Sequence, residues 1–526
     1  MRLLATVAAV NRSMDTEFNR QGVARQGAQA QHQGMTTSAP VRETENPYLN
    51  GNYAPVKEEI TAMDLEITGT IPDYLDGRYL RIGPNPLDDP DPARYHWFFG
   101  TGMAHGLRLR DGKANWYRNR WVRSADVSRT LGETWPGGPT NGGFDFAANT
   151  NIIGHAGKTL AIVEAGARPY ELTDELETVG PSDFCGTLFG GYTAHPKRDP
   201  VTGELHAVSY NPMRGNVVQY TVTGVDGKIR RTVNIRLRAQ TMMHDFSLTQ
   251  KYVVLYDLPV ALDFGANLSS KPAKAVAAML TRFAERHAAP DFFLRAAMRE
   301  SGRGGPPQVG MPYRWAPERQ ARVGVLPREG IAADIRWFQV NPCYVFHPLN
   351  AYDEADRVVL DVVRHPSVFT AGHAIVPGNP SLDRWTVDLT AGKVVEERLD
   401  ETSQEFPRVD ERLVGRPYRY GYAVGYAPGT TGISGPDAIL KHDVATRRTQ
   451  TVSFGPGREP GEFVFVPSSP DAAEDDGVAM GFVYDRSSDR SDLVLLDGQT
   501  LETVATVHLP ARVPHGFHGN WVPTEG

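Results

Sequence analysis

The segment NPCYVFHPLNAYDE, Asn341–Glu354, carries the pattern on which the rest of the chain is organised. Its apolar run CYVF predicts a short buried strand, because β-branched and aromatic residues dominate it. We expect Pro348 to end this strand, because proline has no N–H for the ladder and restricts the residue before it. His347 should then lie at a strand end, with its ring directed toward the centre of the fold. Most histidines in such a position are ordinary buried residues, so its role depends on partners elsewhere in the chain.

Composition limits the class of protein. The chain has 526 residues, of which 40% are hydrophobic and 22% charged, with 52 glycines and 39 prolines. That content of turn formers indicates many short strands joined by tight turns. A net charge of -7 argues against a nucleic-acid-binding protein, which would carry a basic face. The chain has two cysteines, Cys185 and Cys343, which excludes a disulfide framework and a cysteine-based zinc site and is typical of a cytoplasmic protein.

Domain organisation follows from the polar N-terminus and the long apolar-patterned remainder. Residues 1–44 are mostly polar after a short apolar start and lack a signal-peptide pattern, so we predict a disordered tail there. Residues 45–526 are predicted to form a single domain, because all-β folds run long as one unit. No apolar run approaches the ~20 residues that a membrane-spanning helix needs.

Short alternating segments joined by Asp-Gly, Ala-Gly or Asn-Pro turns recur along the chain. One example is YHWFFGTGMAHGLRLRDGKANWY (Tyr95–Tyr117), and another is LVLLDGQTLETVATVHLP (Leu493–Pro510). This pattern favours a sandwich, barrel or propeller over an α/β fold, and the second segment is typical of the outer hairpin of a propeller blade. No short repeat allows the blades to be counted.

One stretch departs from the strand pattern. Residues Ala273–Ser301 are helix-forming, with Pro290 dividing them, and define a helical insertion around residues 270–303. It could be a lid packed on the β-domain, or an amphipathic patch that contacts a membrane or lines a substrate entrance. Arg282 and Arg286 beside its apolar residues support the second interpretation.

Four histidines share one kind of context. His195, His244, His347 and His518 each lie at a predicted strand edge beside proline, glycine or an aromatic residue. Ligands so far apart in sequence can meet only in a fold closed around an axis, as in a propeller. Four neutral imidazoles would suit iron, copper, nickel or zinc, and a structural zinc is disfavoured because such sites recruit cysteine and shorter spacings. His515 competes with His518 in an HxxH pair, and we expect one of the two not to be a ligand because residues three apart on a strand face opposite sides.

Three glutamates stand among apolar residues: Glu164, Glu405 and Glu462. A carboxylate there is costly unless it accepts a charge-assisted hydrogen bond, and a ligand histidine needs its second nitrogen oriented. Each glutamate alone could be a surface strand residue, but the four histidines favour an orienting role. Asp245 follows His244 directly and is expected to point away from the site by strand alternation.

The motifs YLDGRYLRIGPNP, HDFSLT, CYVFHPLNAYDE, EFPRV, EFVFVP, EDDG and GFHGNW occur in this order between Asn46 and Pro523. Together they resemble the carotenoid cleavage oxygenase family, which includes the retinoid isomerase and the lignostilbene dioxygenases, and are most similar to actinobacterial members. The resemblance implies an all-β, seven-bladed β-propeller with a helical cap over one face. It implies a non-haem Fe2+ held by His195, His244, His347 and His518, with Glu164, Glu405 and Glu462 behind them, and so leaves out His515. It also implies that Thr150 lies beside an open iron position.

The implied activity is cleavage of a conjugated C=C bond of a carotenoid or apocarotenoid by O2, giving two carbonyl products. Four neutral histidines leave Fe2+ with its full charge and two open positions beside which an alkene can react. An apolar polyene needs a dry tunnel, and the insertion would help to extract it at a membrane surface. The candidate tunnel residues, for which plain core packing is the alternative, are Trp97, Phe98, Phe99, Phe246, Phe346 and Leu349.

Three other functions stay open at this point. Cleavage of a stilbene is disfavoured because the segment NRWVRSADV (Asn119–Val127) has no lysine to hold a phenol hydroxyl. A retinoid-isomerase-like ester reaction would use the same metal ligands. A non-catalytic terpenoid-binding propeller is the alternative from another class of protein.

Overall fold

The computed structural model describes residues 46–524, apart from residues 93–94, 142–144, 146–147, 264–270, 286, 288–312, 371–377 and 428–434. The predicted tail over residues 1–44 and the second half of the predicted helical insertion lie outside the described residues.

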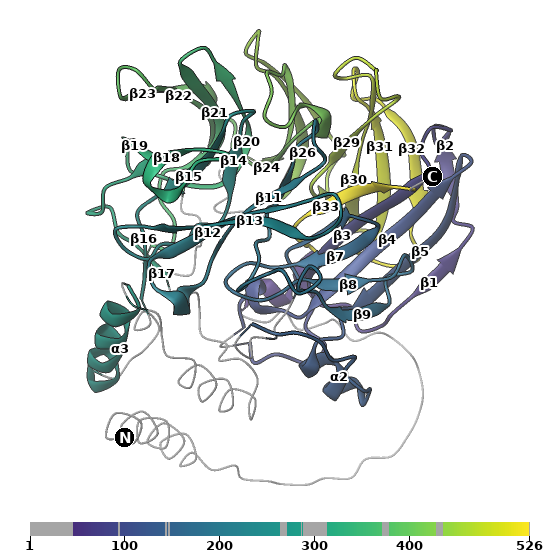
Figure 1. Cartoon of the computed structure of the whole chain (residues 1–526). Coiled ribbons are helices and arrows are strands. Elements are labelled where there is room, and N and C mark those ends of the chain that lie inside the picture. Colours follow the sequence, from purple (N-terminus) through teal and green to yellow (C-terminus); the bar gives the residue numbers. More distant parts are fainter. Residues whose placement is uncertain are drawn as a thin grey trace.

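Seven antiparallel sheets form blades around one axis, as predicted (Figure 1). From the outer to the innermost strand, the first blade contains β1 (Thr61–Met63), β5 (Lys113–Trp121), β4 (Gly102–Arg110), β3 (Gly77–Pro84) and β33 (Gly519–Pro523). The second contains β9 (Thr178–Pro181), β8 (Tyr170–Leu172), β7 (Lys158–Ile162) and β6 (Asn151–His155). The third contains β13 (Ile229–Arg236), β12 (Val217–Thr223), β11 (Leu205–Tyr210) and β10 (Lys197–Arg198).

The remaining blades follow in chain order. The fourth contains β19 (Arg336–Gln339), β18 (Arg322–Pro327), β15 (Tyr252–Asp257) and β14 (Phe246–Leu248). The fifth contains β23 (Lys393–Asp400), β22 (Ser381–Asp388), β21 (Arg357–His365) and β20 (Tyr344–Glu354), and the sixth contains β27 (Arg448–Ser453), β26 (Pro436–Asp443), β25 (Tyr420–Tyr426) and β24 (Gln404–Val409). The seventh contains β2 (Ile67–Gly69), β32 (Thr503–His508), β31 (Arg490–Asp497) and β30 (Gly477–Asp485), with β28 (Arg458–Pro460) and β29 (Val464–Pro467) both paired to β30.

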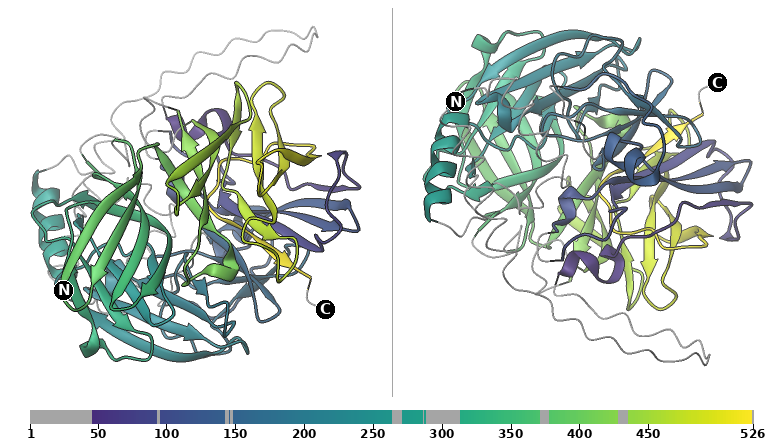
Figure 2. Two further views of the ribbon diagram at one scale, coloured as in Figure 1. Left: turned by 90° about the horizontal axis from the view of Figure 1, so that it is seen from above. Right: turned by 90° about the horizontal axis from the view of Figure 1, so that it is seen from below.

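The two ends of the described chain close the ring. Strand β33, near the C-terminus, pairs with β3 in the first blade, and β2, near the N-terminus, pairs with β32 in the seventh. Figure 2 shows the resulting side-by-side placement of the first and last strands, purple and yellow. The innermost strands also contact one another in the order β14, β20, β24, β29, β33 and β6, around most of the axis.

Strand β20 corrects the prediction for Pro348. The strand continues through Pro348 to Glu354, and its register shifts on both sides of that proline. The prediction that Pro348 ends the strand is therefore wrong. A β-bulge interrupts the hydrogen-bond ladder, so the missing N–H of proline costs no ladder bond there. The bulge also directs the neighbouring His347 toward the axis, since bulges re-aim side chains.

Elements outside the blades lie mainly on one side of the propeller. Helices α2 (Ala125–Leu131) and α3 (Lys271–Ala284) both lie below the blades in Figure 1, and α3 falls in the predicted helical insertion. A two-stranded sheet joins β16 (Val260–Leu262) to β17 (Tyr313–Trp315). The 3-10 turns are η1 (Pro47–Leu49), η2 (Gly51–Tyr53), η3 (Trp97–Phe99), η4 (Pro212–Arg214), η5 (Ala332–Asp334) and η6 (Glu411–Leu413).

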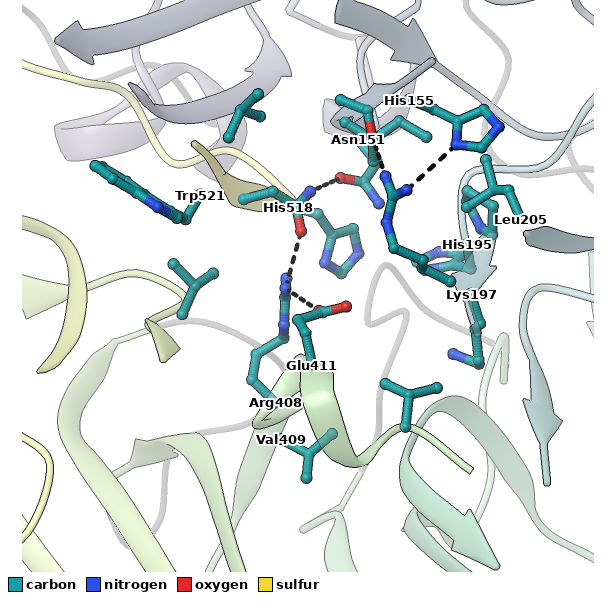
Figure 3. Close-up of a pocket in the computed structure, with 18 of the residues that line it drawn as sticks. Asn151, His155, His195, Lys197, Leu205, Arg408, Val409, Glu411, His518 and Trp521 are labelled. Atoms are coloured by element: carbon teal, nitrogen blue, oxygen red, sulfur yellow. Dashed lines mark hydrogen bonds and ion pairs between the residues drawn. The ribbon is translucent and has the colours of Figure 1, made fainter. Parts of the chain in front are cut away.

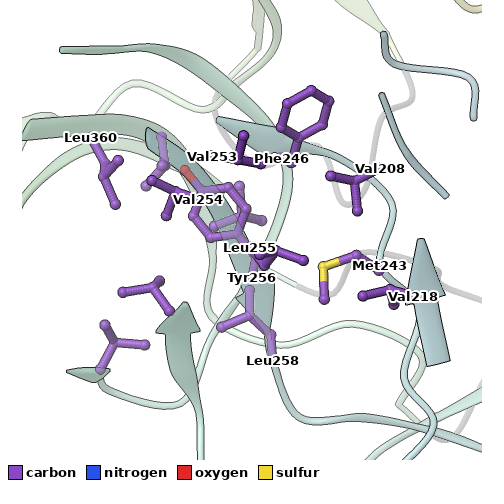
Figure 4. Packing of buried hydrophobic residues seen from close by; sticks show 14 of the residues in the cluster. Val208, Val218, Met243, Phe246, Val253, Val254, Leu255, Tyr256, Leu258 and Leu360 are labelled. Carbon is purple, nitrogen blue, oxygen red and sulfur yellow. The ribbon is translucent and has the colours of Figure 1, made fainter. Parts of the chain in front are cut away.

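Apolar side chains between blades form the core. The largest cluster fills the space between the third, fourth and fifth blades, where alternate residues of β11, β12 and β21 pack with consecutive residues of β15 (Figure 4). Phe246 and Phe346, both candidate tunnel residues, belong to this cluster. Burial of such side chains contributes about 1.5–3 kcal/mol each, and it holds the innermost strands in fixed positions.

Candidate metal centre

The innermost strands all begin at the same end of the axis, and each blade brings one residue to that point. These residues lie just before the strand or within its first four positions: His518 (β33), Thr150 (β6), His195 (β10), His244 (β14), His347 (β20), Glu405 (β24) and Glu462 (β29). This parallel arrangement explains how side chains separated by hundreds of residues in sequence come together.

The four predicted histidines form one cluster. The ring centroid of His195 lies 4.4 Å from that of His244, 5.0 Å from that of His347 and 4.7 Å from that of His518. The ligand nitrogens of His195, His244 and His347 all lie within 4.8 Å of one another. The ring centroid of His518 lies 4.8 Å from that of His347, so the fourth ring adjoins this group.

The nitrogens that face the centre suit a metal ion. The Nε2 atom of His195 is buried and has no hydrogen-bond partner among the described residues. The Nε2 atoms of His244 and His347 lie 3.2 Å apart. Burial lowers the pKa of His195 well below its usual value, with the neighbouring histidines acting in the same direction, and burial also lowers the pKa of His518. In His244, burial would lower the pKa, but the contact with Glu164 outweighs it and raises this pKa, so a metal ion would replace a proton at that ring. Buried neutral imidazoles whose lone pairs converge are the donor set that a divalent transition metal prefers.

Each of three histidines donates its other ring N–H to a glutamate. Nδ1 of His244 lies 2.9 Å from Oε2 of Glu164. Nδ1 of His347 lies 2.6 Å from Oε2 of Glu405, and Nδ1 of His518 lies 2.9 Å from Oε1 of Glu462. A carboxylate at Nδ1 keeps the proton there and leaves the Nε2 lone pair directed at the centre.

Two of these glutamates have further partners that the sequence did not reveal. His365, at the end of β21, contacts Oε1 of Glu405 at 2.7 Å, and Arg408 contacts Oε2 of Glu462 at 3.3 Å. Burial alone would raise the pKa of Glu405, but contacts with His347 and His365 outweigh it and lower this pKa. In Glu462, Arg408 and His518 likewise outweigh burial and lower the pKa to about 2. Both carboxylates are therefore ionised and can offset the charge of a bound cation.

His515 is separate from the cluster. Its Nε2 atom lies 2.8 Å from Oε2 of Glu459, and its ring packs 4.6 Å from that of Tyr53. The Nε2 atom of His515 therefore contacts Glu459 and is not available to bind a metal in the cluster.

Asp245 differs from the sequence expectation. It is buried, its Oδ2 atom lies 3.9 Å from Nδ1 of His195, and it lines the same cavity as that histidine. The prediction that it points away from the site is wrong. Asp245 precedes β14 and accepts the N–H of Phe246 at 2.6 Å, so strand alternation does not apply to it.

A cavity lined by both charged and apolar residues runs along the axis from the histidine cluster. It has a volume of about 660 Å³, and residues of all seven innermost strands line it. Figure 3 shows His195 and His518 beside this cavity, with Lys197 and Arg408 on its walls. Among the candidate tunnel residues, Leu349 lines it and the five aromatic ones do not.

Of the candidate tunnel aromatics, Phe346 packs on a histidine of the cluster, and the others have different partners. Trp97 and Phe98 pack on Phe517 with ring centroids 4.3 and 5.4 Å apart. The ring of Phe346 lies edge-on to His244 at 5.3 Å. Phe99 lies 6.0 Å from the ring of His96, and Phe246 is fully buried.

Thr150 adjoins the fourth histidine. Its carbonyl accepts the backbone N–H of His518 at 3.0 Å, and its hydroxyl donates to Oδ1 of Asn149 at 2.9 Å. The side chain is therefore held in place at the start of β6.

Comparisons with known proteins agree with this architecture. Residues 53–523 match the family described as retinal pigment epithelial membrane protein. A carotenoid cleavage oxygenase of Mycobacterium tuberculosis is 51% identical over 511 residues, covering 93% of this chain and 100% of that protein. A carotenoid 9,10(9',10')-cleavage dioxygenase of Pisum sativum is 32% identical, covering 90% of each chain.

Solved structures lead to the same family. A lignostilbene dioxygenase of Pseudomonas brassicacearum superposes with a TM-score of 0.76 at 27% identity, covering 91% of this chain and 99% of that one. Cobalt-substituted Synechocystis ACO superposes with a TM-score of 0.73 at 26% identity, covering 89% and 97%. The chain therefore belongs to the carotenoid cleavage oxygenase family, as the sequence motifs predicted.

No helix among the described residues is both long and apolar enough to cross a bilayer.

Proposed function

We propose that this oxygenase holds Fe2+ with His195, His244, His347 and His518 and cleaves a conjugated C=C bond of a carotenoid or apocarotenoid with O2. The products are two carbonyl compounds. The observation that carries the proposal is the cluster of four histidines from four blades, three of which donate Nδ1–H to a glutamate. Relatives named as carotenoid cleavage enzymes support the reaction class.

The donor set supports Fe2+ as the cofactor. When bound, Fe2+ supplies the redox chemistry that O2 requires, and four neutral nitrogens leave its positive charge uncompensated in the first layer of contacts. The carboxylates of Glu164, Glu405 and Glu462 lie one layer further out, where they offset this charge and fix the ring orientations. Cobalt in a structural relative supports divalent metal binding by this fold.

The surroundings of the cluster support an apolar substrate. Phe346 packs on His244, Phe406 packs on His347 and His518, and neither aromatic residue lines the axial cavity. The centre thus has aromatic residues on one side and a cavity with both charged and apolar lining residues on the other. We place the polyene on the aromatic side, where water is excluded.

Thr150 and helix α3 complete the proposal. The position of Thr150 beside His518 fits a side chain that limits access to an open metal position. Met279 and Phe283 of α3 are 48% and 47% exposed, beside the exposed Arg282. Exposed apolar residues with a basic neighbour suit contact with the surface of a membrane that holds the substrate.

Product analysis tests the proposed reaction. The iron-loaded protein is incubated under 18O2 with a panel of carotenoids, apocarotenals and hydroxylated stilbenes, with His244→Ala as the matched inactive control. We expect labelled aldehyde or ketone fragments from a carotenoid or apocarotenoid. If the polyenes stay intact while stilbenes are cleaved, the protein is a stilbene-cleaving oxygenase. Binding of a polyene without any product would indicate a binding protein.

The segment around Arg123 favours the carotenoid outcome. Arg123 is bound to Glu59 and Glu133, so this cation is already paired. No lysine in Asn119–Val127 offers an alternative contact for a phenol hydroxyl.

A further inference from the structure

His195 differs from the other three clustered histidines in the partner of its second nitrogen. Its Nε2 atom faces the centre and is buried, as in a ligand histidine. No glutamate lies at its Nδ1 atom, and the structure records no protein hydrogen bond to that atom among the described residues. Without an acceptor at Nδ1, the ring proton can move to Nε2. That tautomer has no lone pair at Nε2 and cannot bind a metal through it.

Asp245 is the carboxylate that faces this nitrogen. Its Oδ2 atom lies 3.9 Å from Nδ1 of His195, and its side chain is 4% exposed. Two donors hold it: the N–H of Phe246 at 2.6 Å and Nζ of Lys197 at 3.0 Å. A buried carboxylate with this support has one fixed orientation.

One water molecule that lies to the side of this gap, in the axial cavity, can contact both atoms. A separation of 3.9 Å is too long for a direct hydrogen bond. His195, Asp245 and Lys197 all line the axial cavity of about 660 Å³, which has room for water beside both groups. Figure 3 shows His195 and Lys197 next to each other on the wall of that cavity. A water molecule there can accept from Nδ1–H and donate to Oδ2.

We propose that Asp245 is a fourth positioning carboxylate of the metal centre and orients His195 through one water molecule of the axial cavity. This inference rests on the proposed function, because it assumes that His195 binds the metal. Asp245 does for His195 what Glu164, Glu405 and Glu462 do for the other three rings.

Asp245 differs from the three glutamates because it is paired with Lys197. The lysine contacts both carboxylate oxygens, so the pair carries no net charge. Asp245 therefore fixes the tautomer and direction of His195 but adds little charge compensation. We expect its loss to weaken metal binding by about tenfold, at the lower end of the roughly 10–100-fold effect of such partners.

The test compares three variants by metal binding, with no use of enzyme activity. Asp245→Asn keeps an oxygen for the N–H of Phe246 but makes the group neutral. Glu405→Gln is the positive reference, because Glu405 contacts His347 directly at 2.6 Å. Glu459→Gln is the matched control, because Glu459 forms a similar contact with the separate His515 at 2.8 Å.

Affinities for Fe2+ and Co2+ are measured by competition with a chelator, together with the visible spectrum of the Co2+ form. Asp245→Asn should bind about tenfold more weakly and shift the Co2+ bands, and Glu459→Gln should match the wild type in both. Thermal unfolding of the metal-free proteins separates a folding defect from a metal effect. Asp245→Ser, which leaves room for a second water molecule, repeats the test if the asparagine variant unfolds.

The outcomes separate the two levels of inference. If the wild type binds neither metal, the proposed iron centre fails. If the wild type and Glu405→Gln behave as expected while Asp245→Asn keeps wild-type affinity and spectrum, the role of Asp245 alone is refuted. Equal losses in Asp245→Asn and Glu459→Gln would also refute it, because a distant carboxylate would then matter as much.

Discussion

His515 and His518 provide a test of the metal centre with an internal control. Both are buried, they lie three residues apart, and each contacts one glutamate. They differ in the nitrogen that makes this contact: His515 uses Nε2, whereas His518 uses Nδ1 and keeps Nε2 for the centre. We therefore predict that His518→Gln loses metal and that His515→Gln retains it.

The structure allows a rough magnitude for each change. Four-ligand metal sites in small folded domains bind with about 10–16 kcal/mol, so one ligand in four accounts for about 3 kcal/mol, or roughly 100-fold in affinity. His515→Gln should leave affinity unchanged and lower the free energy of unfolding by about 1.5–3 kcal/mol, the contribution of one hydrogen bond to a charged group. Glu459 keeps Arg486 at 2.8 Å in that variant, so its charge stays paired.

The assay measures iron per protein after desalting, the dissociation constant by chelator competition, and chemical unfolding of the metal-free proteins. Unfolding data show whether lost metal reflects a lost ligand or a lost fold. Stoichiometric iron in a folded His518→Gln protein would refute the ligand assignment. Loss of metal from a folded His515→Gln protein would show that the nitrogen geometry does not identify the ligands.

Three further predictions follow from the same contacts. Glu405→Gln should weaken iron binding by roughly 10–100-fold with the fold retained, because an amide cannot accept from both His347 and His365; chelator competition checks this, and unchanged affinity would contradict it. The metal-free protein should lose stability in acid, because the pKa of Glu462 is about 2 in the folded protein against an ordinary value of 4.5. The resulting stabilisation of about 3 kcal/mol is present above pH 4.5 and is lost as the pH falls toward 2. Unfolding free energies between pH 6 and pH 3 test this, with Glu462→Gln expected to flatten the profile; an equally steep profile in that variant would assign the loss to other groups. Removal of metal by a chelator should lower the midpoint of thermal unfolding, since a ligand that binds the folded state stabilises it, and re-addition of Fe2+ should restore the midpoint. The same shift in His244→Ala would show that the metal binds away from the histidine cluster.

The architecture could be predicted because the residues that specify each blade lie close together in the sequence. Alternating apolar residues and Asp-Gly turns specify hairpins, as in Leu493–Pro510, which forms most of β31 and all of β32. The shared strand-edge context of His195, His244 and His518 matches their places one or two residues before innermost strands. Family motifs supplied the count of blades, which periodicity alone did not.

Local reasoning failed where the backbone departs from regular strand geometry or where partners are distant. Pro348 lies in a bulge, which a sequence cannot distinguish from a strand end. The direction of Asp245 was predicted wrongly because this residue precedes β14 instead of lying within it. Arg408 and His365 stand in ordinary strand contexts, and only the ring of blades brings them to Glu462 and Glu405.

Ring closure and metal uptake are linked by the position of β33. His518 directly precedes this strand, which completes the first blade with a segment from the far end of the described chain. The other three clustered histidines belong to the consecutive third, fourth and fifth blades and can come together before that strand docks. A metal held by all four rings would therefore favour the closed ring over any state with β33 detached, by the free energy that the fourth ligand contributes. Metal release would then report the detachment of the closing strand, ahead of the unfolding of the blades themselves.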